Sequence, residues 1–159
     1  MFYSISNCQA GLANVSFGNF LIKQVASDLS SELPGLTTFV TLSPIPGLVK
    51  WLQKSHPDWI VDEQEDLRSL AAHYLINEKS RNNLPLDPVA RFHLGNGAIL
   101  EEIHVDSDIS ENGKLQSLGC MVNYLYDLEQ VTKNHEEFVS EGKVKASKEI
   151  EKLAKAFEL

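Results

Sequence analysis

The fold is decided by residues 37–47, which read TTFVTLSPIPG. The first six of these residues are β-branched or apolar, and this composition predicts a buried strand over 37–42. Ser43 follows at the carboxyl end of that strand, where ligands bind in open α/β sheets. Pro44 and Pro46 exclude regular strand pairing and stiffen the segment into a turn. Ser43 is therefore a candidate functional side chain, or alternatively a Ser-Pro turn residue whose hydroxyl caps the next helix.

The residues on the amino-terminal side of this stretch predict a βαβ unit. Residues 2–6, which read FYSIS, alternate large and small side chains and predict a strand. A loop punctuated by Gly and Ala covers residues 9–18. Apolar residues then recur at three- and four-residue steps over 20–33, which is typical of an amphipathic helix, and Pro34-Gly35 ends it. The two strands of a βαβ unit are expected to run parallel.

The loop over residues 9–18 is a candidate anion site. Because it leaves a strand and enters a helix, its backbone N–H groups and the helix N-terminus are expected to point at one spot, which suits a phosphate. The loop contains neither a GxGxxG nor a GxxxxGK[ST] motif, and many such loops carry glycine for turn geometry alone. From the residues themselves, phosphate binding and simple turn geometry both stay open.

The carboxyl-terminal side adds helices and a predicted hairpin. Helices are expected over 48–54 and 62–77, followed by a polar, proline-containing connector. The segments 89–94 and 98–105 flank Gly95-Asn96-Gly97, and Asn-Gly between alternating runs indicates a β-hairpin.

The secondary structure of the last third of the chain is predicted less clearly. Residues 106–113 form a polar loop, and residues 120–126 fit a helix or a strand equally well. Helical spacing of apolar residues resumes from Ser147 and predicts a terminal helix.

His93 is the third candidate, on one arm of the predicted hairpin. A free imidazole titrates near ~6.5, which suits proton donation at neutral pH. The alternative is a partly buried, hydrogen-bonded histidine without a chemical role. The five histidines show no HxxxH, HxxEH or HxH spacing, so no metal site is expected.

Bulk composition narrows the possible functions. The chain has 159 residues with 43% hydrophobic and 23% charged side chains, which are ordinary values for one globular domain. Its formal net charge of −8 is opposite to what phosphate-backbone binding needs, so nucleic acid is not an expected partner. No apolar window approaches the ~18 residues of a membrane span, and the N-terminus has no signal-peptide pattern. Cys8 and Cys120 are expected to be reduced thiols, and the absence of a targeting signal indicates the cytoplasm or an organelle matrix.

Taken in chain order, the segments resemble the C-terminal catalytic portion of malonyl-CoA decarboxylase. The resemblance rests on five strings, which cover nearly the whole chain: FYSISN at 2–7, GNFLIK at 18–23, TLSPIPG at 41–47, DPVARFHL at 87–94 and MVNY at 121–124.

The resemblance implies a fold of the α/β (α+β) class, namely a partial N-acetyltransferase-like mixed sheet with flanking helices and its first strands missing. Residues 1–159 are then a partial catalytic domain, without the N-terminal helical domain of the family. An exposed strand edge at 2–6 and an incomplete acyl-CoA groove are expected to follow. We therefore expect this piece alone to bind malonyl-CoA weakly and to decarboxylate it poorly.

The resemblance also implies a reaction and a site. Malonyl-CoA is cleaved to acetyl-CoA and carbon dioxide, as part of fatty-acid metabolism, without metal, biotin or another prosthetic group. Ser43 and His93 match the catalytic residues. His93 is expected to protonate the carbanion, and Ser43 to orient the malonyl carboxylate or thioester, although the family assigns it as a proton acceptor. The CoA-phosphate loop corresponds to Ala13, Asn14, Val15, Ser16, Phe17, Gly18 and Asn19, and the weaker candidates for lining the pocket are Asn123 and Tyr124.

Two other functions stay open at this point. One is a CoA-dependent acyltransferase of the same fold, which would need an acceptor site with a general base. The other is a non-catalytic acyl-CoA-binding fragment, in which CoA binding persists after His93→Ala and neither form turns over. The expected partners are malonyl-CoA and acetyl-CoA, and homo-oligomer formation stays open.

Overall fold

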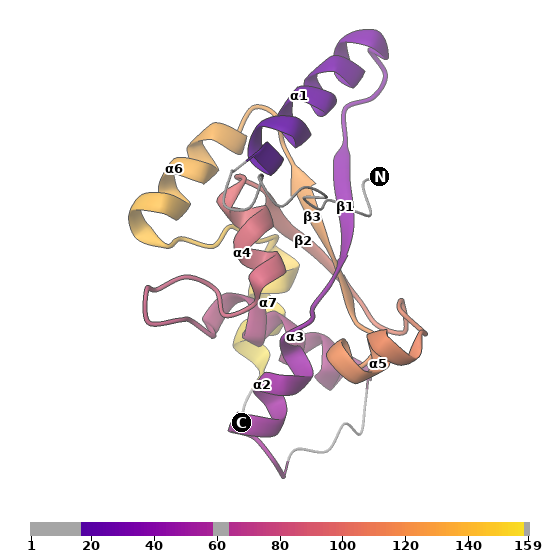
Figure 1. Cartoon of the computed structure of the whole chain (residues 1–159), viewed down its shortest axis with the longest axis vertical. Helices are drawn as coiled ribbons and strands as arrows, with labels where there is room; N and C mark the ends of the chain where they lie inside the picture. Colours follow the sequence, from indigo (N-terminus) through magenta and orange to yellow (C-terminus); the bar gives the residue numbers. More distant parts are fainter. Residues whose placement is uncertain (1–16, 59–63, 158–159) are drawn as a thin grey trace.

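The computed structural model describes residues 17–58 and 64–157 (Figure 1). The expected strand over residues 2–6, and its parallel pairing with the strand that precedes Ser43, lie outside the described residues. The elements follow one another along the described chain in this order: α1 (Phe17–Glu32), β1 (Phe39–Pro44), α2 (Leu48–Ser55), α3 (Gln64–Asn77), α4 (Pro88–Gly95), β2 (Ile99–His104), α5 (Glu111–Ser117), β3 (Met121–Tyr126), α6 (Val131–Glu141) and α7 (Lys148–Ala156).

The described strands form an antiparallel sheet in the order β1-β3-β2. The central strand, β3, is the last of the three in the sequence and pairs with both neighbours. In the register with β1, Tyr124 lies opposite Thr41 and Val122 opposite Ser43. The combination of this sheet with its helices confirms the mixed α/β class expected from the sequence.

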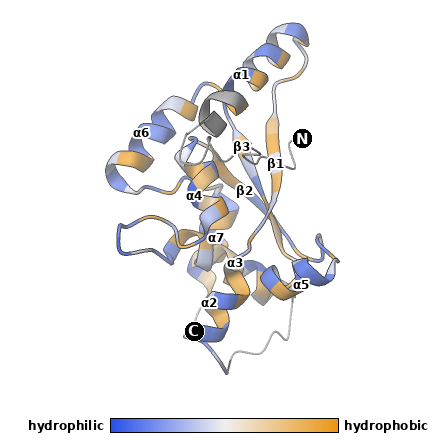
Figure 2. Ribbon diagram, viewed as in Figure 1, coloured by the Kyte–Doolittle hydropathy of each residue, from blue (hydrophilic) through white to orange (hydrophobic). Residues whose placement is uncertain are grey.

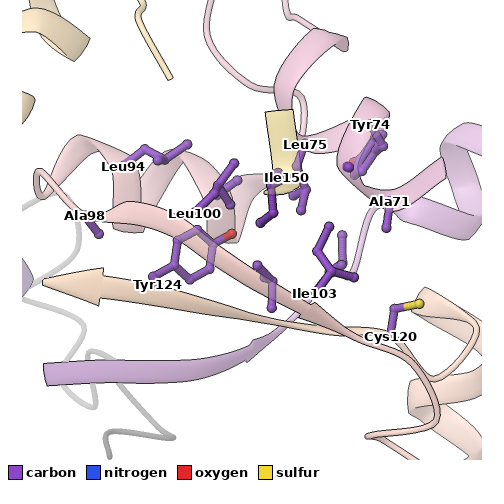
Figure 3. Packing of buried hydrophobic residues seen from close by; sticks show 14 of the residues in the cluster. Ala71, Tyr74, Leu75, Leu94, Ala98, Leu100, Ile103, Cys120, Tyr124 and Ile150 are labelled. Carbon is purple, nitrogen blue, oxygen red and sulfur yellow. The ribbon is translucent and has the colours of Figure 1, made fainter. Parts of the chain in front are cut away.

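One face of the sheet is covered by helices, which decides where polar side chains are buried. On β1 and β3 alternate residues are buried, as a strand with one covered face requires. The helices α3 and α7 pack against each other and against β2. Figure 3 shows Leu75 and Ile150 meeting Leu100 and Ile103 between these layers, and Figure 2 shows hydrophilic residues on the outer sides of the helices. The buried side chains of β1 and β3 thus point into an apolar layer.

The predicted hairpin arm over 89–94 is wrong, because residues Pro88–Gly95 form the helix α4. Asp87 is its N-cap, and Pro88 takes the first helical position, where a missing N–H costs nothing. Gly97 follows with φ +81°, and a Cβ there would lie 1.9 Å from the carbonyl oxygen of Val131. The glycine of the Asn-Gly pair therefore allows α6 to approach closely, and the Asp-Pro helix signal outweighs the hairpin signal.

The other predicted elements within the described residues are present in the structure, and α5 differs from the prediction. The helices predicted over 20–33, 48–54 and 62–77 correspond to α1, α2 and α3, and the ambiguous segment 120–126 is the strand β3. The short helix α5 begins inside the segment that was expected to be a loop. Cys120 is a buried free thiol, and its burial raises the pKa to about 12. Within the described ranges no helix is both long and apolar enough to cross a membrane.

Candidate active site

The structure brings Ser43 and His93 together. Ser43 lies near the end of β1, where the sheet gives way to the proline turn, and His93 lies in the last turn of α4. The distance from Ser43 Oγ to His93 Nε2 is 3.1 Å, which is within hydrogen-bonding range. Both side chains are buried, with exposed fractions of 7% and 4%. A hydroxyl and an imidazole in contact inside an apolar layer form a pair able to exchange a proton.

Two tyrosines of β3 fix the orientation of the His93 ring. The hydroxyl of Tyr126 lies 2.8 Å from His93 Nδ1, so both ring nitrogens have partners. Tyr124 stacks on the ring with a centroid distance of 4.3 Å and an interplanar angle of 18°. Sequence reasoning missed Tyr126, although the two-residue period of β3 places it on the same face as Tyr124.

The weaker pocket candidates, Asn123 and Tyr124, lie on opposite faces of β3. Tyr124 is fully buried and contacts His93 through its ring face. Asn123 lies on the other face of β3, where its amide donates to the carbonyl oxygen of Thr41 at 2.9 Å and its carbonyl contacts His104. The structure therefore brings Tyr124 to the pair formed by Ser43 and His93 and leaves Asn123 away from it.

The predicted phosphate loop is described only at its end. Ala13, Asn14, Val15 and Ser16 lie outside the described residues, whereas residues 17–19 form the first turn of α1. A helix N-terminus thus stands where the sequence places the end of the loop, and phosphate binding there stays a prediction.

Burial sets the protonation of the site. Removal from water lowers the pKa of His93 from 6.5 to about 4, because the charged imidazolium is poorly solvated there. Burial also raises the pKa of Tyr126 above its ordinary value of 10. At neutral pH the site therefore holds a neutral imidazole and a neutral phenol. This differs from the sequence expectation, which used the titration of a free histidine.

A groove of about 570 Å³ begins at the turn that follows Ser43. Pro46 and Gly47 form its first wall, and it continues along Lys50 and Lys54 of α2 to Tyr74 of α3. Neither Ser43 nor His93 lines it. Among the residues that the structure describes, no group of three His, Cys, Asp or Glu side chains is arranged to hold a metal ion.

With this geometry established, the comparisons define the class of protein. A family model described as the malonyl-CoA decarboxylase C-terminal domain matches residues 1–66 and 56–158. The chain belongs to the malonyl-CoA decarboxylase family, through that C-terminal domain.

Individual relatives carry the same name. The chain is 36% identical to "Malonyl-CoA decarboxylase, mitochondrial" of Mus musculus, over 99% of this chain and 41% of the mouse protein. It is 33% identical to the protein of that name from Anser anser anser, again over 99% of this chain and 40% of the goose protein. The chain thus spans well under half the length of the curated relatives it matches.

Solved structures of malonyl-CoA decarboxylases agree with the described fold. The protein from Rhodopseudomonas palustris superposes with a TM-score of 0.86 and 44% identity, over 96% of this chain and 41% of that one. The protein from Agrobacterium vitis gives a TM-score of 0.84 and 45% identity, over 96% and 44% of the two chains.

The match to the mouse protein is not continuous. The alignment extends over 203 positions, more than the 159 residues of this chain, so the mouse protein contains positions with no counterpart here. The family match is divided into two stretches that meet at residues 56–66.

Proposed function

We propose that this chain catalyses the decarboxylation of malonyl-CoA to acetyl-CoA and carbon dioxide, with Ser43 and His93 as its catalytic residues. The observation that carries the proposal is the 3.1 Å contact between Ser43 Oγ and His93 Nε2 in a buried site. The names of the relatives support the choice of substrate. The resemblance in sequence supports the choice of residues.

The first step breaks the bond between the malonyl carboxylate and the α-carbon. Carbon dioxide leaves, and the electron pair remains on the α-carbon and spreads onto the thioester oxygen. The thioester accepts these electrons, so the proposed chemistry uses no metal or prosthetic group. A donor aimed at an oxygen that gains charge is worth ~2.7–4 kcal/mol in comparable sites. The Ser43 hydroxyl is the donor we assign to that oxygen.

The second step protonates the α-carbon. Burial keeps His93 neutral at pH 7, and the negative charge of a bound malonyl group favours its protonated form. We therefore assign His93 the uptake of one solvent proton when substrate binds, followed by its transfer from Nε2 to the α-carbon. A positioned general acid contributes typically ~10²–10⁴-fold. Tyr126 acts as a positioning residue, because its hydroxyl holds His93 Nδ1.

Binding of the CoA phosphates has to overcome the charge of the protein. The formal net charge is −8, and CoA is a polyanion. The first backbone N–H groups of a helix have no partner within the helix and carry a partial positive charge, and α1 begins at Phe17. This placement supports the proposal that residues 13–19 form the phosphate loop.

The experiment measures release of labelled carbon dioxide from carboxyl-labelled malonyl-CoA by the purified chain. Ser43→Ala and His93→Gln are expected to lower the rate at least 100-fold with little change in CoA affinity. Ser107→Ala and His56→Gln replace the same residue types away from the site and are expected to keep the wild-type rate. Wild-type turnover in both site variants would contradict the proposal.

Two further measurements distinguish the decarboxylase from an acyltransferase and from a non-catalytic binding fragment. Transfer of an acetyl group from acetyl-CoA to an amine, without carbon dioxide release, would indicate an acyltransferase. CoA binding without turnover of either substrate would indicate a non-catalytic binding fragment.

A further inference from the structure

We propose that Asp87 is a positioning residue that couples the turn after Ser43 to the helix carrying His93. The inference rests on the function proposed above, because it concerns the geometry of the same catalytic pair. It goes further by assigning a role to a side chain that touches neither of the two catalytic residues in the described contacts.

The Asp87 carboxylate joins two segments of the chain inside the core. Its side chain has no exposed surface. One oxygen, Oδ1, accepts from the backbone N–H groups of Val89 and Ala90, both at 2.9 Å. The other oxygen, Oδ2, accepts from the backbone N–H of Gly47 at 3.1 Å. One carboxylate therefore caps the start of α4 and binds the turn between β1 and α2.

Each of these segments leads directly to a catalytic residue. Gly47 is joined to Ser43 through Pro44, Ile45 and Pro46, and the two prolines restrict the backbone between them. His93 follows Asp87 along α4 at a rise of ~1.5 Å per residue, so the helix transmits its position rigidly. The bond from Gly47 to Asp87 thus fixes the turn relative to the helix.

The close approach at Gly47 depends on the absence of a side chain. A Cβ at this position would lie 2.1 Å from the hydroxyl oxygen of Tyr74 and 3.3 Å from Asp87 Oδ2. Tyr74 is itself buried, with 1% of its surface exposed, so it has little room to move. The backbone at Gly47 has φ −91°, which any residue adopts. Space, and not backbone conformation, therefore accounts for glycine here.

A neighbouring arginine holds the chain that precedes Asp87. Arg91 Nη1 donates to the carbonyl oxygens of Pro85 and Leu86 at 2.9 and 2.8 Å. These bonds attach the chain that enters Asp87 to the second turn of α4. The carboxylate is consequently held in place by α4. Loss of its bond to Gly47 therefore displaces the turn after Ser43 and not the helix.

The simpler explanation is that Asp87 only caps α4. Two variants distinguish this role from coupling to the turn at Gly47. Asp87→Ser keeps a side-chain oxygen for the N–H groups of α4, because serine is a good N-cap, but it is too short to reach Gly47. Gly47→Ala leaves the cap intact and pushes the turn away from Asp87. The matched control is Ser110→Ala, which removes the N-cap of α5.

The readout is the NMR spectrum of the His93 ring, recorded against pH in the full chain. We expect Asp87→Ser and Gly47→Ala to displace both ring ¹⁵N signals and to raise the midpoint of titration by at least one pH unit, because a displaced turn admits water. Ser110→Ala is expected to leave the signals unchanged. The double variant Gly47→Ala, Tyr74→Phe removes the hydroxyl that a Cβ would meet, and is expected to recover part of the wild-type spectrum.

Unchanged His93 signals in folded Asp87→Ser and Gly47→Ala would overturn the inference and leave Asp87 as a cap. Should one variant fail to fold, the other decides the matter, since they disrupt the same bond from opposite sides. In an active chain, kcat is expected to fall at least tenfold in both variants while KM stays within twofold. The spectra need no turnover. An inactive wild type with displaced signals in both variants would therefore contradict the decarboxylase proposal alone.

Discussion

Burial of His93 as a neutral imidazole predicts a protein that loses stability in mild acid. The pKa falls from 6.5 in the unfolded chain to about 4 in the folded protein. Between these values the unfolded state binds more protons, so the free energy of unfolding decreases as the pH falls. Each pKa unit corresponds to ~1.36 kcal/mol. The contribution is therefore fully present above pH 6.5, and about 3 kcal/mol is lost by pH 4.

The assay is urea and thermal unfolding, followed by circular dichroism at several pH values between 7 and 4. Carboxylates also titrate in this range, so the wild type is compared with His93→Gln, which lacks the proton-binding group. The decrease between pH 7 and pH 4 is expected to be about 3 kcal/mol larger in the wild type. For a chain of this size that difference corresponds to roughly 6–12 °C in Tm.

Two controls make the result specific to His93. His56→Gln makes the same substitution at a histidine outside the pair and serves as the matched comparison. The His93 Hε1 resonance in the wild type gives the folded-state midpoint directly, whatever the stability of the variant. Equal slopes in the wild type and His93→Gln, or a resonance that titrates near 6.5, would refute the assignment of a neutral buried imidazole.

Three further predictions concern single side chains. Tyr126→Phe removes the hydroxyl on His93 Nδ1 and is expected to lower kcat about tenfold at nearly unchanged KM, as measured by steady-state kinetics. Ser147→Ala removes the oxygen that accepts from the N–H of Ile150 at the start of α7, and urea unfolding should show a loss of ~0.5–2 kcal/mol. Gly97→Ala combines a positive φ with a Cβ 1.9 Å from a carbonyl oxygen, so a loss above about 2 kcal/mol is expected, and wild-type stability would contradict the close approach of α6.

A strand next to the proline turn could be predicted from the sequence, because its β-branched run acts locally. Its end could not: the strand expected over 37–42 is β1 at Phe39–Pro44, where Ser43 lies opposite Val122 and Pro44 opposite Met121. The identity of Ser43 and His93 as a pair came from the resemblance to a family. Their contact depends on the packing of α4 against the sheet, and no spacing between residues 43 and 93 encodes that packing.

Local sequence patterns gave a wrong prediction, or none, where two patterns competed or where a helix or strand is only partly buried. Asn-Gly after residue 95 favoured a hairpin, but the buried carboxylate of Asp87 stabilises the helix that contains His93. The helix α6 was missed because few of its side chains are apolar; its buried positions are Val131, Asn134 and Phe138. Tyr126 was missed because residues 120–126 fit two kinds of structure, and only the strand places alternate tyrosines on one face.

The strand order β1-β3-β2 has a consequence for synthesis of the chain on the ribosome. Neither β1 nor β2 has a partner in the described sheet until β3 has emerged, because β3 lies between them. During translation the edges of β1 and β2 that β3 later covers are therefore exposed first, and exposed strand edges favour association between nascent chains. Tyr124 and Tyr126 arrive on that same late strand. Stacking of Tyr124 on His93 thus begins only when β3 joins the sheet.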